Sequence, residues 1–279
     1  MRSRVLSLAL ASLLVGSVIA ALLLYSPNER LSVPIDADEG QNRNKGAKPV
    51  IAQYGDISEL KLLKASDKVD VKSTPAPKDA TVLFDGKALD GWLSRNGGKA
   101  KWKLLPDGIA QSGGGDIYTE KKFDGKFKVH VEFRVPYYPG KGGQQRGNSG
   151  VYVQGRYEVQ ILDSYGLKSK DTDCGGIYEV AAPKSNECKA PTVWQSYDIE
   201  FTSPKFEGKK KISPAKMTVH HNGVKIHDNV EIKVDNTRSG MGGDTSKPGP
   251  IMLQDHGDPV QFRNVWVLPL EDEATPVKD

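Results

Sequence analysis

Two carboxylates and an amide lie close together in the segment 157–163. Glu158 and Gln160 alternate with apolar residues, and this period of two places the polar pair on one face of a strand. Asp163 lies an odd number of positions from Glu158, so in a regular strand it faces the other way. A one-residue bulge near Ile161–Leu162 would return it to the face of Glu158. These groups could then line a concave surface; ordinary polar residues on a solvated sheet face are the alternative.

Two other segments are expected to contribute polar side chains beside this motif. The Gly-rich loop 136–148 leads directly into it, and loops of this length are often functional, so Arg146 and Asn148 are candidates to reach over the same face. The other candidates surround a tight turn near the end of the chain: Gln254, Asp255, His256 and Arg263.

Short strands and turns dominate the chain from residue 80 to residue 270. The strand 126–135 alternates apolar and polar residues, as in an antiparallel sheet with one buried and one wet face, and His130 is expected on the wet face. An Asn222-Gly223 pair between two such strands predicts a hairpin. We expect no long amphipathic helix in this range. The pattern predicts an all-β fold, a two-sheet antiparallel β-sandwich or jelly roll.

The composition narrows the class of protein. The chain has 279 residues, with 39 Lys and Arg against 35 Asp and Glu, and its mean hydropathy is -0.49. Its 29 Gly and 17 Pro fit a loop-rich and strand-rich domain better than a helical bundle. Because the lysines are scattered rather than grouped, we expect no nucleic-acid partner.

The first 25 residues differ in character from the rest. Arg2 and Arg4 precede an uncharged apolar run from Val5 to Tyr25, which is typical of a cleaved signal peptide; a retained membrane anchor is the alternative, because the run is long enough to span a bilayer. Either role places the remainder outside the cytoplasm, as a periplasmic, secreted or membrane-tethered protein. The expected order is then a flexible linker over 26–78, a folded domain over 79–271 and a tail over 272–279.

Cys174 and Cys188 are the two cysteines of the chain. In an oxidising compartment we expect them to form a disulfide, closing a loop of about 15 residues worth ~3 kcal/mol in the loop-entropy model. Two buried free thiols are the alternative. His220 and His221 are adjacent, point to opposite faces of a strand, and make a poor pair of metal ligands.

Several motifs together resemble those of the 3-keto-disaccharide hydrolase domain family. They occur in the family's order over residues 81–268: Leu83 to Trp92, Asn148 to Val151, Tyr157 to Ser164, Ile251 to Gly257 and Val260 to Val265. The family is similar to concanavalin-like jelly-roll lectins and glucanases, which agrees with the strand pattern. The resemblance implies a carbohydrate substrate.

The jelly-roll glucanases carry a Glu-x-Asp-x-x-Glu signature, and Glu158, Gln160 and Asp163 stand at the corresponding positions. Here the middle acid is an amide and the last side chain is one carbon shorter, which does not suit two-carboxylate retaining hydrolysis. A 3-keto glycoside offers another route, because its ketone acidifies the hydrogen on C2. A base removes that proton, an enolate forms, the glycosidic oxygen leaves from C1, and water then adds to the unsaturated product.

This route needs a base, an acid and a stabiliser for the enolate oxygen. The resemblance implies Glu158 or His256 as the base and Asp163 as the acid. A divalent metal held by these three residues would also suit polarisation of the ketone; no other cofactor is expected. The residues expected to bind the sugar, stabilise the oxyanion or orient His256 are Arg146, Asn148, Gln160, Gln254, Asp255 and Arg263.

Two other functions fit the same residues. One is a carbohydrate-binding, lectin-like module without catalysis, and the other is an envelope-associated structural domain. A lectin does not need clustered acid and base groups, so the cluster favours the enzyme. We therefore expect an extracytoplasmic enzyme that cleaves 3-keto-glycosides or related sugars.

Overall fold

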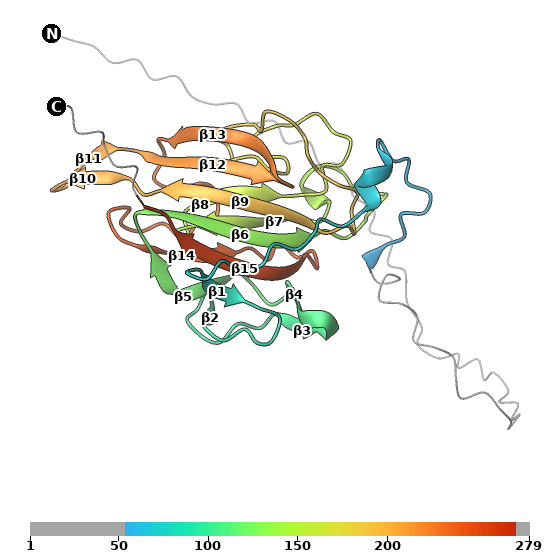
Figure 1. Cartoon of the computed structure of the whole chain (residues 1–279), viewed down its shortest axis with the longest axis horizontal. Coiled ribbons are helices and arrows are strands. Elements are labelled where there is room, and N and C mark those ends of the chain that lie inside the picture. Colours follow the sequence, from blue (N-terminus) through green and yellow to red (C-terminus); the bar gives the residue numbers. More distant parts are fainter. Residues whose placement is uncertain (1–53, 272–279) are drawn as a thin grey trace, which may run out of the picture. The chain divides into compact units, whose positions relative to one another are not determined.

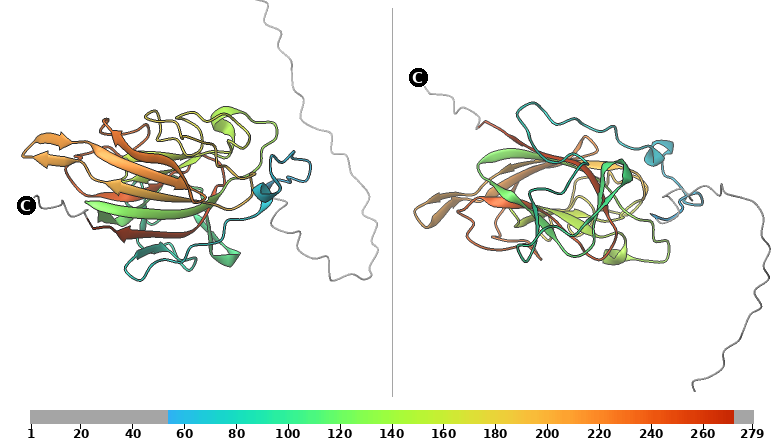
Figure 2. Two further views of the ribbon diagram at one scale, coloured as in Figure 1. Left: turned by 45° about the horizontal axis from the view of Figure 1, so that its top comes forward. Right: turned by 90° about the horizontal axis from the view of Figure 1, so that it is seen from below.

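Two antiparallel sheets face each other across an apolar core (Figure 1, Figure 2). The structure is a computed structural model and describes residues 54–271, all within one compact unit. It confirms the predicted β-sandwich of the jelly-roll type. The described helices are three short 3-10 turns, η1 (Ala65–Lys68), η2 (Pro106–Gly108) and η3 (Gly143–Gln145).

The larger sheet has eight strands in the order β13-β12-β9-β6-β15-β4-β3, with β1 paired to β15. In chain order its strands are β1 (Thr81–Phe84), β3 (Lys103–Leu105), β4 (Ile109–Gln111), β6 (Lys126–Arg134), β9 (Gln195–Thr202), β12 (Ala215–His221), β13 (Val224–Ile232) and β15 (Gln261–Pro269). The predicted hairpin at Asn222 and Gly223 is confirmed, since it joins β12 to β13 and both residues have positive φ.

The smaller sheet has five strands in the order β2-β5-β14-β7-β8. Its strands are β2 (Trp92–Ser94), β5 (Ile117–Phe123), β7 (Ser149–Val153), β8 (Tyr157–Ile161) and β14 (Gly249–Leu253). A separate hairpin of β10 (Lys205–Glu207) and β11 (Lys210–Ser213) extends from one end of the sandwich (Figure 1).

Strand β6 shows how the period of two builds the core. Val131 and Phe133 point between the sheets and are fully buried. His130 and Glu132 point to the other face, yet they are fully buried as well. The prediction that His130 lies on the surface is therefore wrong: its ring stacks on Trp266 and its Nδ1 lies 2.9 Å from Asp198 Oδ1.

Residues 54–78 are the described part of the predicted linker, and several of them lie against this outer face of the larger sheet. The Ser73 hydroxyl and the Thr74 backbone N–H donate to Glu132, at 2.6 and 3.1 Å. The Val71 N–H donates to the Trp194 carbonyl, and the buried Tyr54 donates to the Arg134 carbonyl. These residues are thus ordered against the domain, and the linker prediction is wrong for this stretch.

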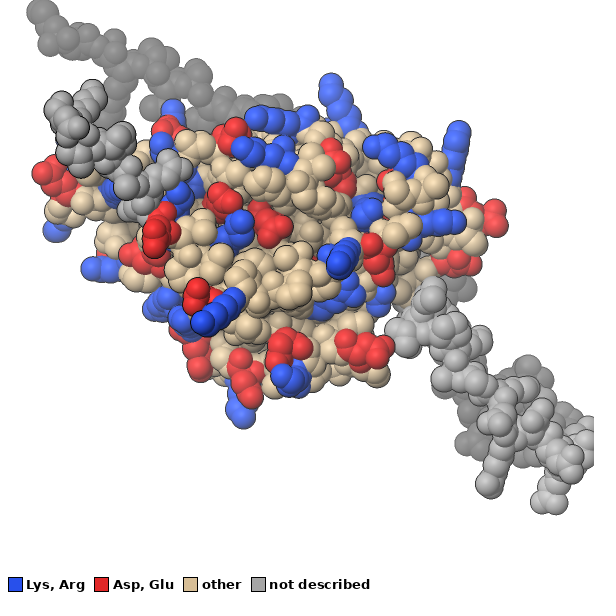
Figure 3. Space-filling view, in the orientation of Figure 1, with Lys and Arg blue, Asp and Glu red and all other residues tan. Residues whose placement is uncertain are grey.

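The predictions for residues 1–25 and for the tail 272–279 lie outside the described residues. Within 54–271, no helix is long and apolar enough to cross a membrane. On the face seen in Figure 3, Lys and Arg are interspersed with Asp and Glu.

Candidate functional site

A small polar pocket lies over the outer face of the smaller sheet. Tyr157, Val159 and Ile161 of β8 point into the core, so Glu158 and Gln160 point outward, as the alternation predicted. The buried floor of the pocket consists of Asn148, Tyr152, Glu158, Gln160 and Gln254. Its half-buried or exposed rim consists of Gln144, Tyr178, Arg238, Ser239 and His256.

Gly150 makes room for the carboxyl group of Glu158. Strands β7 and β8 pair with Gly150 opposite Gln160 and Tyr152 opposite Glu158, so the Glu158 side chain can lie across position 150. A Cβ atom on residue 150 would overlap Glu158 Oε1 and come within 3.0 Å of Tyr152 Cε2. The glycine is therefore required by close approach rather than by its backbone angles.

The environment of Glu158 keeps its carboxyl group protonated at neutral pH. Burial raises the pKa of Glu158 from 4.5 to about 8; a hydrogen bond to Tyr152 acts in the opposite direction, and the charges of Asp116 and Glu179 add to the rise. A protonated carboxyl group in a pocket can donate a proton to a leaving group. This resembles the way in which glycoside-cleaving enzymes prepare an acid.

Gln144 connects the floor to the rim. Its Oε1 accepts hydrogen bonds from the side-chain amides of Asn148 and Gln160, at 3.0 and 2.9 Å. Its own side-chain N–H donates to the Thr172 carbonyl at 2.8 Å. Three segments that are distant in sequence are thereby fixed around the pocket.

Asp163 is not among the residues that line the pocket. Strand β8 ends at Ile161 and pairs with β7 without any shift of register, so the predicted bulge is absent from the strand and that prediction is wrong. Asp163 lies beyond the strand end, where it is buried and accepts a hydrogen bond from Arg146 Nη2 at 2.9 Å. The half-buried Arg146 and the buried Asp163 form an ion pair beside the site, and neither lines the pocket.

Two further candidates have structural partners away from the pocket. Asp255 accepts hydrogen bonds from the backbone N–H groups of Gly115 and Gly257, at 2.8 and 3.0 Å, so it holds its own turn rather than the His256 ring. Arg263 donates to Glu132 at 2.6 Å and lies over the Trp194 ring on the larger sheet. Its strand was assigned correctly, but it belongs to the opposite layer of the sandwich.

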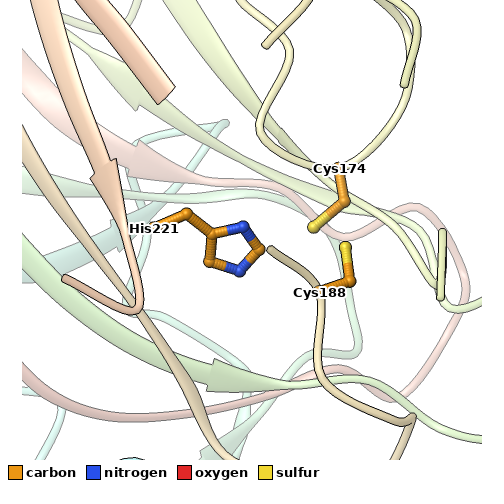
Figure 4. Close-up of side chains that lie close together, drawn as sticks. All are labelled: Cys174, Cys188 and His221. Atoms are coloured by element: carbon orange, nitrogen blue, oxygen red, sulfur yellow. The ribbon is translucent and has the colours of Figure 1, made fainter. Parts of the chain in front are cut away.

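The two cysteines lie in the core close to His221 (Figure 4). Both are free thiols in the structure, in contrast to the predicted disulfide. Among the described residues, Cys174, Cys188 and His221 are the one group of His, Cys, Asp or Glu whose ligand atoms gather closely enough for a metal, all within 4.8 Å of one another. Glu158, Asp163 and His256, the residues named for a possible divalent metal, do not form such a group, because Asp163 pairs with Arg146 outside the pocket.

The cysteine pair is connected to the site through Tyr197. Tyr197 lies 3.1 Å from Cys174 Sγ and donates to the Gln160 carbonyl at 2.7 Å. Burial lowers the pKa of His221 to about 3, so the ring is neutral, and its Nε2 bonds to Gln195 Oε1. The cluster supports the strand that carries the acid.

Sequence reasoning missed much of the rim. Arg238 and Ser239 belong to the connection between β13 and β14, where no local pattern marks them. Tyr178 follows the first cysteine, and its backbone N–H donates to the Glu158 carbonyl, which continues the sheet beside β8. Gln144 lies within the Gly-rich loop 136–148, for which only Arg146 and Asn148 were predicted as site residues.

The protein is thus a jelly-roll sandwich that carries a protonated acid in a polar pocket on its smaller sheet. Residues 79–268 match the family of 3-keto-alpha-glucoside-1,2-lyase-like domains, and the chain belongs to this family. No curated protein matches the chain.

Two solved structures from Parabacteroides distasonis ATCC 8503, both described as candidate glycosyl hydrolases, are similar to this chain. The first is 38% identical, aligns over 70% of this chain and 86% of its own, and has a TM-score of 0.62. The second is 23% identical over 75% of this chain and 99% of its own, with a TM-score of 0.51. The second likeness concerns the fold alone, whereas the first also supports a glycoside-active enzyme.

Proposed function

We propose that this protein cleaves 3-keto-glycosides outside the cytoplasm by elimination followed by hydration. A base removes the proton on C2, the electrons move into an enolate at the C3 oxygen, and the bond from C1 to the glycosidic oxygen breaks. A proton from an acid neutralises the leaving oxygen. Water then adds across the unsaturated bond to give the free 3-keto sugar. The family to which the chain belongs supports this chemistry.

The observation that carries the proposal is the buried, protonated carboxyl group of Glu158. Since its pKa is about 8, the group holds a proton at neutral pH and suits the role of acid. Sequence reasoning placed Glu158 or His256 as the base and Asp163 as the acid. The ion pair of Asp163 with Arg146 removes it from the pocket, so Glu158 takes the acid role and His256 the base role.

His256 is positioned to act from the mouth of the pocket. Its side chain is exposed and lines the rim above the floor that carries Glu158. A neutral imidazole can accept the C2 proton, which the neighbouring ketone has already acidified. A base at the rim and an acid in the floor can act on opposite sides of a bound sugar.

The direct test compares methanol release from methyl 3-keto-α-glucoside, deuterated at C2, and from the same glucoside without the ketone. We expect release only from the keto substrate, with loss of deuterium from C2 into water. Glu158→Gln should lower turnover about 10²- to 10⁴-fold, and His256→Asn by a similar factor. Glu207→Gln, on the exposed β10–β11 hairpin, is the matched control.

The pH profile separates the two roles of Glu158. If Glu158 is the acid, the rate falls as pH rises through about 8, the pKa of its carboxyl group. A rate that rises through the same range would reassign Glu158 as the base. Equal release from both glucosides would contradict elimination, and saturable sugar binding without turnover would favour the lectin-like alternative.

A further inference from the structure

Two amide oxygens in the pocket floor lack hydrogen-bond donors. Asn148 Oδ1 and Gln160 Oε1 are buried, and neither has a partner among the described residues. Only Tyr157 among the described residues also has an unpartnered buried polar atom, its hydroxyl. An unmet buried acceptor costs roughly 1–3 kcal/mol, so two of them side by side in one pocket call for an explanation.

The orientation of these amides is fixed by a group that can only accept. The Thr172 carbonyl receives N–H groups from Gln144 and Gln160, at 2.8 and 3.4 Å. Gln144 therefore turns its Oε1 toward Asn148 and Gln160. These two residues donate their side-chain N–H groups to it. Turning any one amide would set oxygen against oxygen, so the two free oxygens are held in place.

The pocket floor presents hydrogen-bond acceptors and one proton to a ligand. It presents no unpaired positive charge from the described residues. Arg146 is paired with Asp163, and Arg238 at the rim is paired with Glu179 at 2.9 Å. The hydroxyl of Tyr152 is already engaged, since it donates to the Arg238 carbonyl, accepts from Gln254 and is also hydrogen-bonded to Glu158. A carboxylate or sulfate on a sugar would face the unpartnered oxygens of Asn148 and Gln160, whereas a hydroxyl would supply the donor that they lack.

We infer that Asn148 and Gln160 accept hydrogen bonds from two hydroxyl groups of an uncharged sugar, and that Gln144 is the residue that positions them. The inference rests on the proposed function for the location of the site, and it adds the two acceptors that recognise hydroxyl groups of the sugar and the residue that orients them. Arg238, Ser239 and His256 are exposed at the rim, on the side from which a sugar would approach the floor.

Binding without turnover tests this, because the probes lack the ketone. Methyl α-glucoside, its 2-, 4- and 6-deoxy analogues and methyl α-glucuronide are titrated against the full protein by NMR. We expect saturable binding of the glucoside. Two of the deoxy analogues should bind about tenfold more weakly or worse, and the glucuronide should be weakened similarly. Equal binding of glucoside and glucuronide, or no loss with any deoxy analogue, would overturn the inference, as would the absence of saturable binding.

Variants assign the hydroxyls to their acceptors. Gln160→Met should weaken binding of the glucoside about tenfold, and removal of the matching hydroxyl should cost this variant nothing more. Gln144→Met should weaken binding by a similar factor and reduce the difference between the glucoside and its deoxy analogues, and Gln144→Glu should not restore binding, because one of its carboxylate oxygens would face the Thr172 carbonyl. Gln145→Met is the matched control, since Gln145 is the exposed neighbour on the same turn, and it should bind normally.

The outcomes distinguish this inference from the proposed function. Hydroxyl-specific binding without cleavage of the keto substrate would remove the catalytic proposal and leave the binding residues in place. Cleavage with an unchanged KM in Gln160→Met and Gln144→Met would remove the binding role of these residues and leave the catalytic proposal in place. Because folding could be affected, each variant is compared with the parent by its thermal unfolding temperature before binding is measured.

Discussion

At the scale of single residues, the acid depends on a space that only glycine leaves. Glu158 is buried on the outer face of β8, and its carboxyl group lies over Gly150 on the neighbouring strand. The same burial that raises the pKa of Glu158 thus requires the absence of a side chain across the ladder. The sequence shows this glycine within a strand, where glycine is otherwise unfavourable.

Gly150→Ala tests this contact. The new methyl group would overlap Glu158 Oε1, so we expect the carboxyl group to be displaced, with a loss of about 1–3 kcal/mol in stability and a large loss of turnover. Gly140→Ala is the matched control, because a Cβ there meets nothing within 4 Å. Turnover and thermal unfolding measured on both proteins give the answer; normal turnover in Gly150→Ala would contradict the packing described.

At the scale of elements, the periodicity of the sequence predicted the strands and part of the site. Glu158 and Gln160 share a face because the period of two fixes it, and Asn148, Gln254 and His256 join them at the pocket. Asp163 was misplaced because a bulge cannot be read from side-chain pattern alone. The rim residues come from loops whose spatial approach depends on contacts between distant segments, which no local signal encodes.

The N-terminal segment was missed for a related physical reason. Residues 54–78 are polar and contain no long apolar run, so composition alone suggests a linker. Their order comes from hydrogen bonds to groups on the larger sheet, chiefly Glu132 and the Trp194 carbonyl. Asp70 likewise accepts from the Trp194 N–H at 2.9 Å.

Removing this segment should destabilise the domain. A protein that begins at residue 79 leaves Glu132 without two of its donors, at roughly 1.5–3 kcal/mol for each bond to a charged group. We expect its unfolding temperature to fall by about 6 °C or more relative to a protein that begins at residue 54. Equal unfolding temperatures would show that the segment contributes no stability.

At the scale of the whole molecule, the pKa values of two buried glutamates on opposite outer faces are shifted in opposite directions. Burial raises the pKa of Glu158 to about 8. Burial would also raise the pKa of Glu132, but hydrogen bonds from His130, Ser73, Asn264 and Arg263 outweigh it and lower the value to about 2. One glutamate is therefore stable as the neutral acid and the other as the anion.

The free energy of unfolding should therefore decline at both the acid and the alkaline end of the pH range. For Glu158 the folded pKa is raised, so its contribution is fully present below 4.5 and is lost as pH rises through about 8. For Glu132 the folded pKa is lowered, so its contribution is present above 4.5 and is lost as pH falls toward 2. Glu158→Gln should therefore flatten the alkaline decline in unfolding temperature, and Glu132→Gln the acid decline. A Glu158→Gln curve parallel to that of the parent above pH 6 would contradict the raised pKa.

The division of the pocket between strands and loops has a consequence for how this domain could be altered. Three of the five floor residues, Tyr152, Glu158 and Gln160, are fixed in paired strands, whereas Tyr178 lies in the connection between β8 and β9, and Arg238 and Ser239 lie in the connection between β13 and β14. Loop lengths can change with little cost to a scaffold. New leaving-group preferences should therefore be reachable by randomising these three rim positions, in a library that retains the acid and its supporting ladder intact.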